Sequence, residues 1–163
     1  RFFSYGTLQF PEVLAAVTGC HLEGERAMLD DYACNHQGAD DPGITPEHEA
    51  SVEGVVYTGI GEAHFRKLDR FEGELYERVR VCLTDTEGNS LQAWTYVIRE
   101  DARDQLTRAP WNKQDFEVEH LPGFLKDARP ETAPEQQAHR RVEADGAMPL
   151  GKLILLLGLI LVL

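Results

Sequence analysis

The sequence predicts a single domain that mixes strands with helices. Residues 75–84 alternate apolar and polar side chains, and residues 91–99 repeat this strand pattern after a short turn. Residues 62–71 instead space their apolar side chains at the period of a helix. Hydrophobic residues make up 42% of the 163 residues and charged residues 27%, which is ordinary for a soluble globular protein. One mixed domain is therefore the expectation.

The beginning of the chain predicts a strand, a tight loop and a helix in quick succession. Residues 1–5 are a short apolar strand that runs into Gly6. Pro11 suits the first turn of a helix, and apolar side chains recur on one side of the stretch that follows. Residues 20–34 alternate irregularly, which indicates a strand with a bend at Gly24.

The middle of the chain predicts a loop, a strand and a helix. Residues 35–50 are rich in glycine, aspartate and proline, which favour turns, and they predict a polar loop. Residues 51–60 carry β-branched and aromatic side chains, and Gly54 within this strand marks a bulge or a close approach of another backbone. The helix of residues 62–71 then ends at Gly73, which is well placed as a C-cap.

The second half of the predicted domain is a hairpin and a short helix. Residues 85–89 have the composition of a hairpin turn between the two strands that flank them. The return strand carries Trp94 and Tyr96. A short helix over residues 115–121 follows a loop that contains Trp111.

The composition changes beyond Lys126. Residues 128–147 combine charges and prolines with few apolar side chains, which is typical of a flexible linker, so we place the domain at residues 1–127. Residues 148–163 form an apolar C-terminal tail, and residues 153–163 contain no polar side chain. As a helix, this last run would span about 16 Å, roughly half of a hydrocarbon core of ~30 Å.

Three interpretations of the apolar tail stay open. It is an incomplete membrane anchor, a segment that docks on an apolar groove of a partner protein, or a sequence not native to the domain. At the other end, the chain starts at Arg1 with an apolar pair, which indicates a slightly trimmed N-terminus rather than a targeting segment. We expect a cytoplasmic protein whose membrane or partner contact, if any, is made through residues 153–163.

Charge and composition argue against several functions. The net charge of −12 repels phosphate backbones, so a nucleic-acid partner is not expected. Cys20, Cys34 and Cys82 show no C-x-x-C spacing, which argues against a disulfide framework or a zinc knuckle. The six histidines never form an H-x-x-x-H or H-x-H pair. We therefore expect no metal.

The first candidate site is the loop of Tyr5, Gly6, Thr7 and Leu8, called the YGTL loop below. It places a glycine and a small hydroxyl residue at the end of a strand. Backbone N–H groups exposed in such a loop can line a concave site for an anion or a carbonyl oxygen. The alternative is that Gly6 merely forms the turn between a strand and a helix.

The second candidate is the carboxyl group of Glu72. It follows the apolar Phe71 and lies one helical turn after Asp69. Desolvation and a neighbouring like charge both raise the pKa of a carboxyl group, and a general acid/base that works at neutral pH needs a raised pKa. The alternative is a solvated carboxylate at a helix end.

Ordered motifs connect these two candidates over residues 2–127. They are FFSYGTL at 2–8, G-x-R-A-x-L at 24–29, V-x-G-V-V-Y at 52–57, LDRFEG at 68–73, Y-E-R-V-x-V at 76–81, W-T-Y at 94–96 and W-x-x-x-D-F at 111–116. In this order they resemble the γ-glutamylcyclotransferase-like family, including its plant pathogen-response, avirulence-induced branch. Several ordered motifs are far more specific than either candidate alone.

The resemblance implies an α+β fold, a small mixed β-barrel with peripheral helices, whose mouth holds the site. It places the catalytic carboxylate on Glu72 and the substrate-holding loop on Tyr5, Gly6, Thr7 and Leu8. It does not assign roles to the neighbouring residues. Asp69 either tunes Glu72 or lies at the surface, Tyr76 has no assigned role, and Arg78 is expected on an exposed strand face.

The resemblance also implies a reaction that needs no cofactor. The α-amine of a γ-glutamyl amine or γ-glutamyl amino acid attacks its own γ-carbonyl, which releases 5-oxoproline and a free amine. Ring closure supplies the proximity, Glu72 acts as general acid/base, and loop N–H groups stabilise the oxyanion. Two alternatives stay open: a non-catalytic module of the same fold that binds a small ligand in stress responses, and an adaptor localised by its tail.

Overall fold

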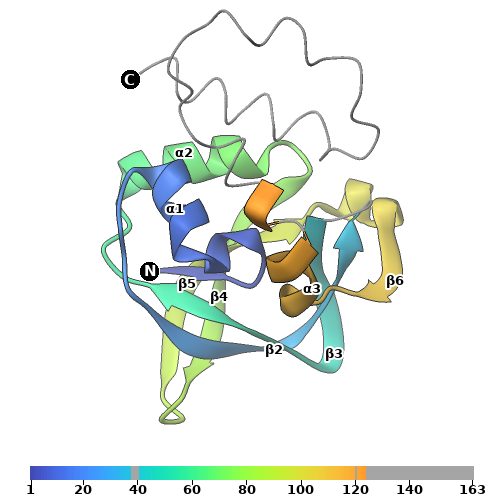
Figure 1. The fold of residues 1–163 in the computed structure, drawn as a ribbon. Helices are drawn as coiled ribbons and strands as arrows, with labels where there is room; N and C mark the ends of the chain where they lie inside the picture. The colour runs from blue at the N-terminus through green and yellow to red at the C-terminus, as the bar shows by residue number, and fades with distance from the viewer. Residues whose placement is uncertain (38–40, 120, 124–163) are drawn as a thin grey trace, which may run out of the picture.

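The computed structural model describes residues 1–37, 41–119 and 121–123, and Figure 1 shows the fold. Its strands and helices, including two short 3₁₀ turns, follow one another in a fixed order. They are β1 (Phe2–Ser4), η1 (Thr7–Gln9), α1 (Pro11–Thr18), β2 (Gly24–Gln37), β3 (Asp41–Tyr57), α2 (Glu62–Glu72), β4 (Tyr76–Asp85), β5 (Ser90–Ile98), η2 (Glu100–Gln105), β6 (Leu106–Pro110) and α3 (Lys113–Glu119).

The strands close into a barrel. The sheet runs in the order β3-β1-β5-β4-β2, and β2 pairs again with β3, so the ring has no free edge. Strand β6 pairs with the C-terminal end of β2. The strand β1 runs parallel to β5, whereas the other neighbours are antiparallel. The expected α+β fold, a small mixed β-barrel with peripheral helices, is therefore confirmed.

Strand β1 separates two apolar cores because successive side chains of a strand point to opposite faces. Phe3 belongs to the core made by side chains of the barrel strands, such as Leu29 and Leu83. Phe2 belongs to the core on the other face, where residues of α1, α2 and α3 pack. Figure 1 shows α1 and α2 lying together against one side of the barrel. The start of the chain thus lies between both cores.

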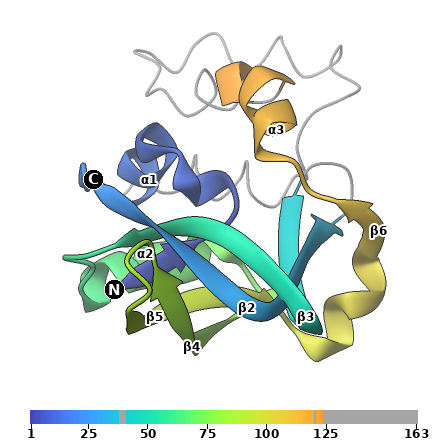
Figure 2. The ribbon, with the colours of Figure 1, turned by 90° about the horizontal axis from the view of Figure 1, so that it is seen from below.

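The prediction of a polar loop over residues 35–50 is wrong. Strand β2 continues to Gln37 and β3 begins at Asp41, so the described residues of this stretch belong to a long antiparallel ribbon. The ribbon bends instead of ending: its register shifts after Asp30, and Asp31 and Glu49 have positive φ values of 60° and 63°. Figure 2 shows β2 and β3 curving together across the molecule.

The prolines of this ribbon were one reason for predicting a loop. Pro42 pairs in register with His36, and Pro46 with Tyr32. A proline cannot donate to a ladder, but it is tolerated in a strand where its missing N–H is not needed. The carbonyl of Pro42 is used, since the hydroxyl of Tyr76 donates to it at 2.8 Å. The prolines here are thus part of a strand and do not mark a loop.

The remaining elements lie close to their expected positions, with three differences. Strand β2 starts at Gly24, and not at Cys20. The turn η2 and the strand β6 were not expected from the sequence; β6 pairs with β2 at two positions only. Helix α1 begins at Pro11 as expected, and the bounds of α2, β4, β5 and α3 agree with expectation to within two residues.

Gly54 confirms the expected close approach of two backbones. A Cβ atom at this position would overlap the carbonyl oxygen of Ser4 and the ring of Phe3. Both residues belong to β1, whose pairing with β3 runs Phe3↔Val56 and Ser4↔Val55. Only glycine therefore lets β1 lie this close to β3.

Gly54→Ala is expected to lower the free energy of unfolding by about 1–3 kcal/mol, as overpacking in a tight site does. Urea denaturation measures this change. The control is Glu53→Ala at the neighbouring position, where the exposed side chain forms a surface pair with Arg26 at 3.5 Å; it should change stability by less than about 0.5 kcal/mol. Equal stability of the two variants would contradict the packing argument.

None of the helices within the described ranges is long and apolar enough to cross a membrane. The expected linker of residues 128–147 and the apolar tail of residues 148–163 lie outside the described residues.

Candidate active site

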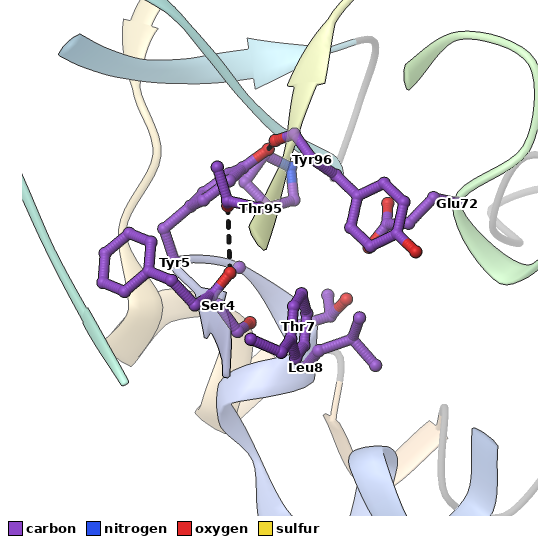
Figure 3. A pocket seen from close by; sticks show the side chains of 11 residues that line it. Ser4, Tyr5, Thr7, Leu8, Glu72, Thr95 and Tyr96 are labelled. Atoms are coloured by element: carbon purple, nitrogen blue, oxygen red, sulfur yellow. Dashed lines mark hydrogen bonds between the residues drawn. The ribbon is translucent and has the colours of Figure 1, made fainter. Parts of the chain in front are cut away.

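A pocket opens where β1 ends, between the YGTL loop, strand β5 and the last residue of α2. The empty space in and above it is about 280 Å³, which includes open solvent. Figure 3 shows its side chains. The lining residues are Phe2, Phe3, Ser4, Tyr5, Gly6, Thr7, Leu8, Pro42, Glu72, Thr95 and Tyr96. All four residues of the YGTL loop and Glu72 thus meet in one pocket.

The YGTL loop is a strand end followed by one 3₁₀ turn. The backbone N–H of Gln9 donates to the carbonyl of Gly6 at 3.0 Å, and its side-chain amide donates to the carbonyl of Tyr5 at 2.5 Å. The first N–H groups of a helical turn have no acceptor within that turn. Among the described residues, no side chain caps η1. The two hydrogen bonds of Gln9 thus stabilise the backbone of the YGTL loop.

Gly6 is required by its surroundings. A Cβ atom at this position would overlap the side chain of Pro42 from strand β3. Pro42 is itself held, because the hydroxyl of Tyr76 donates to its carbonyl oxygen. The loop therefore lies directly against the bent ribbon of β2 and β3.

The side chains of Tyr5 and Leu8 anchor the loop to the two cores. The hydroxyl of Tyr5 donates to the carbonyl oxygen of Tyr96 at 2.7 Å. Burial raises the pKa of Tyr5 well above its usual value, with smaller contributions from Tyr76 and Glu72. Leu8 is 1% exposed and packs with Phe2. Both side chains are therefore committed to contacts within the protein.

Glu72 is the last residue of α2, and the helix end determines where it points. Phe71 before it is buried in the helix-side core. Gly73 after it has a positive φ of 77°, and its N–H donates to the carbonyl of Asp69 at 3.1 Å. With Phe71 held inside and the chain turning at Gly73, the half-buried Glu72 side chain lines the pocket. Figure 3 shows it next to the ring of Tyr96.

Asp69, Tyr96 and Arg78 form a hydrogen-bonded group beside the pocket. The Tyr96 hydroxyl donates to Oδ1 of Asp69 at 2.7 Å, and Nε of Arg78 lies 3.3 Å from the same oxygen. Burial raises the pKa of Tyr96, and the hydrogen bond to Asp69 raises it further. Tyr96 is therefore a neutral phenol.

Arg78 is not on an exposed strand face as the sequence suggested. Its side chain is 24% exposed, and its guanidinium carbon lies 4.4 Å from the ring centre of Phe65 and 5.3 Å from that of Trp94. These rings come from α2 and β5 and cover the cation. The alternating sequence pattern correctly predicts that Arg78 lies on a strand. It does not predict the contact with Phe65, because that contact depends on how helix α2 packs against the strand.

Tyr96 is one of the pocket residues that our site prediction missed. Its hydroxyl contact with Asp69 and its carbonyl contact with Tyr5 both join distant parts of the chain. The neighbouring Thr95 hydroxyl donates to the carbonyl of Phe3 at 2.9 Å and joins β5 to β1 (Figure 3). The W-T-Y motif was the available signal, but on its own it indicates only a strand.

Within the described ranges, no three His, Cys, Asp or Glu side chains cluster so that they could hold a metal ion.

Comparison with known proteins decides the family. The family model described as "Gamma-glutamyl cyclotransferase, AIG2-like" matches residues 2–116. The chain belongs to this family. All residues that line the pocket fall inside the matched range. The resemblance of the ordered sequence motifs to this family is thus confirmed.

Several relatives come from Arabidopsis thaliana. AIG2-like protein D is 33% identical over 128 residues, which cover 76% of this chain and 83% of the relative. AIG2-like protein C is 37% identical over 136 residues and covers 78% of each chain. A solution structure of an Arabidopsis thaliana protein has a TM-score of 0.61 at 26% identity and covers 77% of this chain and 76% of its own.

A solved γ-glutamyl cyclotransferase shares the fold of this chain. Its TM-score is 0.56 at 17% identity, and the match covers 83% of this chain and 89% of the other. At this identity the likeness shows the common fold. The fold and the family are thus those of γ-glutamyl cyclotransferase-like proteins.

Proposed function

We propose that this protein is a cyclotransferase that releases 5-oxoproline and a free amine from a γ-glutamyl amide. One observation carries the proposal: Glu72 and the YGTL loop, far apart in the sequence, line the same pocket. Membership of the γ-glutamyl cyclotransferase, AIG2-like family supports it.

The proposed reaction uses groups of the substrate and one carboxylate of the protein. The α-amine attacks the γ-carbonyl carbon, a new C–N bond closes the five-membered ring, and the bond to the leaving nitrogen breaks. Glu72 accepts the proton from the attacking amine and returns it to the leaving nitrogen. No water or redox partner is consumed, and the intramolecular attack supplies the proximity.

The loop backbone is proposed to stabilise the oxyanion that forms at the γ-carbonyl. N–H groups at the start of a helical turn are suited to this because they lack acceptors within the turn. The side chains of Tyr5 and Leu8 are engaged in the cores. In this proposal they hold the backbone of Gly6 and Thr7 in place against the substrate.

The alternative is a non-catalytic module that binds a small ligand in the same pocket. It is favoured by the engagement of the Tyr5 and Tyr96 hydroxyls in bonds within the protein. A pocket built for binding alone has no evident need for the Glu72 carboxylate. Turnover separates the two functions.

The test is a panel of γ-glutamyl amino acids, γ-glutamylamines and γ-glutamyl-ε-lysine, with release of 5-oxoproline as the measurement. We expect turnover of at least one compound, because Glu72 and the YGTL loop line the same pocket. The control is the same compound acetylated on its α-amine, which lacks the attacking nucleophile and should give no product. Stabilisation of the protein by 5-oxoproline without any turnover would favour the binding module. If the protein shows no turnover of any panel compound and no stabilisation by 5-oxoproline, both functions are refuted.

A further inference from the structure

We propose that Asp69 is a positioning residue for this site: it accepts the hydroxyl hydrogen bond of Tyr96 and thereby fixes the pocket wall beside Glu72. The inference rests on the proposed cyclotransferase function. It concerns a residue that lies outside the pocket lining and acts through Tyr96.

Tyr96 is held at both of its ends. Its carbonyl oxygen accepts a hydrogen bond from the Tyr5 hydroxyl at 2.7 Å, and its own hydroxyl donates to Asp69 at 2.7 Å. Its ring makes an edge contact with Phe2, the centroids being 5.9 Å apart. The residue is 4% exposed, although its ring lines the pocket. Of these restraints, only the Asp69 bond holds the hydroxyl end.

Asp69 also belongs to the helix turn that presents Glu72. Residues three apart lie on the same side of a helix, so Asp69 and Glu72 share one side of α2. The carbonyl of Asp69 accepts the N–H of Gly73, which ends the helix directly after Glu72. One residue thus connects the wall strand β5 with the helix end that carries the proposed acid/base.

The charge of Asp69 is balanced locally. Nε of Arg78 lies 3.3 Å from Oδ1 of Asp69, and the guanidinium is covered by Phe65 and Trp94. Asp69 and Glu72 would otherwise be two like charges one helical turn apart, which is unfavourable. Arg78 therefore lets a second carboxylate lie near Glu72 and hold Tyr96.

The hydrogen bond also determines what Tyr96 can offer to a substrate. A phenol carries one proton, and here that proton points to Asp69. The hydroxyl oxygen can then only accept hydrogen bonds from other partners. An acceptor next to Glu72 suits an α-amine, which is the group that must be oriented for attack on the γ-carbonyl.

The experiment measures kcat and KM for the most active panel compound in Asp69→Ala, Tyr96→Phe and the double variant. We expect each single variant to lower kcat by about 10–100-fold, as small misplacements of reacting groups do, with a smaller change in KM. If Asp69 acts through the Tyr96 hydroxyl, the double variant is no slower than the slower single variant. Asp69→Asn keeps an acceptor for the phenol and should recover part of kcat.

Asp101→Ala is the matched control. Oδ1 of Asp101 lies 3.3 Å from Nε of Arg99, the same distance as in the Asp69 pair, but the Asp101 side chain is 75% exposed and outside the pocket. This variant should retain wild-type kcat. Thermal unfolding of every variant checks the fold, and Tyr96→Phe and Asp69→Asn carry the test if Asp69→Ala unfolds.

The outcomes separate the two proposals. If the wild type is active and Glu72→Gln is not, but Asp69→Ala behaves as Asp101→Ala does, the positioning role is overturned and the proposed function stands. Fully multiplicative effects of Asp69→Ala and Tyr96→Phe would also overturn it. If the wild type releases no 5-oxoproline from any panel compound, the proposed function fails and this inference fails with it.

Discussion

Glu72→Gln is expected to lower kcat for 5-oxoproline release by about 10³-fold or more while the fold and ligand binding are retained. Glutamine has nearly the shape of glutamate and can still form hydrogen bonds, but it cannot accept the proton of the attacking amine. Proton transfer by a positioned side chain contributes about 10²–10⁴-fold to rate. Single-turnover kinetics measure the loss, and thermal shift with 5-oxoproline measures binding.

The control for this variant is Glu74→Gln. Glu74 follows Gly73, is exposed, and does not line the pocket. Removal of its charge should leave kcat unchanged, so a general effect of net charge is separated from the specific role of Glu72. Near-native turnover by Glu72→Gln would falsify the assignment of the general acid/base, whatever the panel shows for the wild type.

Phe2→Ala is expected to have the largest effect on stability, about 3–5 kcal/mol less free energy of unfolding. Phe2 is 1% exposed and contacts aromatic rings from three directions. The ring centroids of Tyr57 and Phe65 both lie 6.4 Å away, and that of Tyr96 lies 5.9 Å away. Because small domains are stable by only about 5–15 kcal/mol, this loss brings the protein near its unfolding threshold.

Val118→Ala is the comparison for Phe2→Ala in urea denaturation. Val118 on α3 is 70% exposed, so its truncation should cost less than about 0.5 kcal/mol. A cost below about 1 kcal/mol for Phe2→Ala would show that the helix-side core repacks around the lost ring. The prediction that the Phe2 ring of β1 is central to the stability of this core would then be wrong.

Local patterns made parts of the fold predictable. The period of residues 62–71 and the alternation on either side of the turn at residues 85–89 correspond to α2 and the β4–β5 hairpin. The stretch of residues 35–50 was not predictable in this way. Its prolines and glycines favour turns locally, whereas residues 35–37 pair both with residues 41–43 and with the distant strand β6.

The candidate site was predictable only in part, for a similar reason. The YGTL loop and Glu72 were singled out from the sequence, and the structure places them in one pocket. The contact of Tyr96 with Asp69 and the aromatic cover of Arg78 were not predictable. Both depend on how α2 packs against β4 and β5, and no local spacing encodes that distance.

The pairing of the short strand β1 makes the pocket depend on parts of the chain that are distant in the sequence. The YGTL loop follows directly after β1, which is held between β3 and β5, so its position requires a chain folded as far as residue 98. Such distant pairings form only after the entropy of closing long loops has been overcome. A partly folded chain with an intact α2 and β4–β5 hairpin would carry Glu72 but no pocket. Ligand binding therefore reports on complete closure of the barrel, and a destabilised variant should lose it together with the fold.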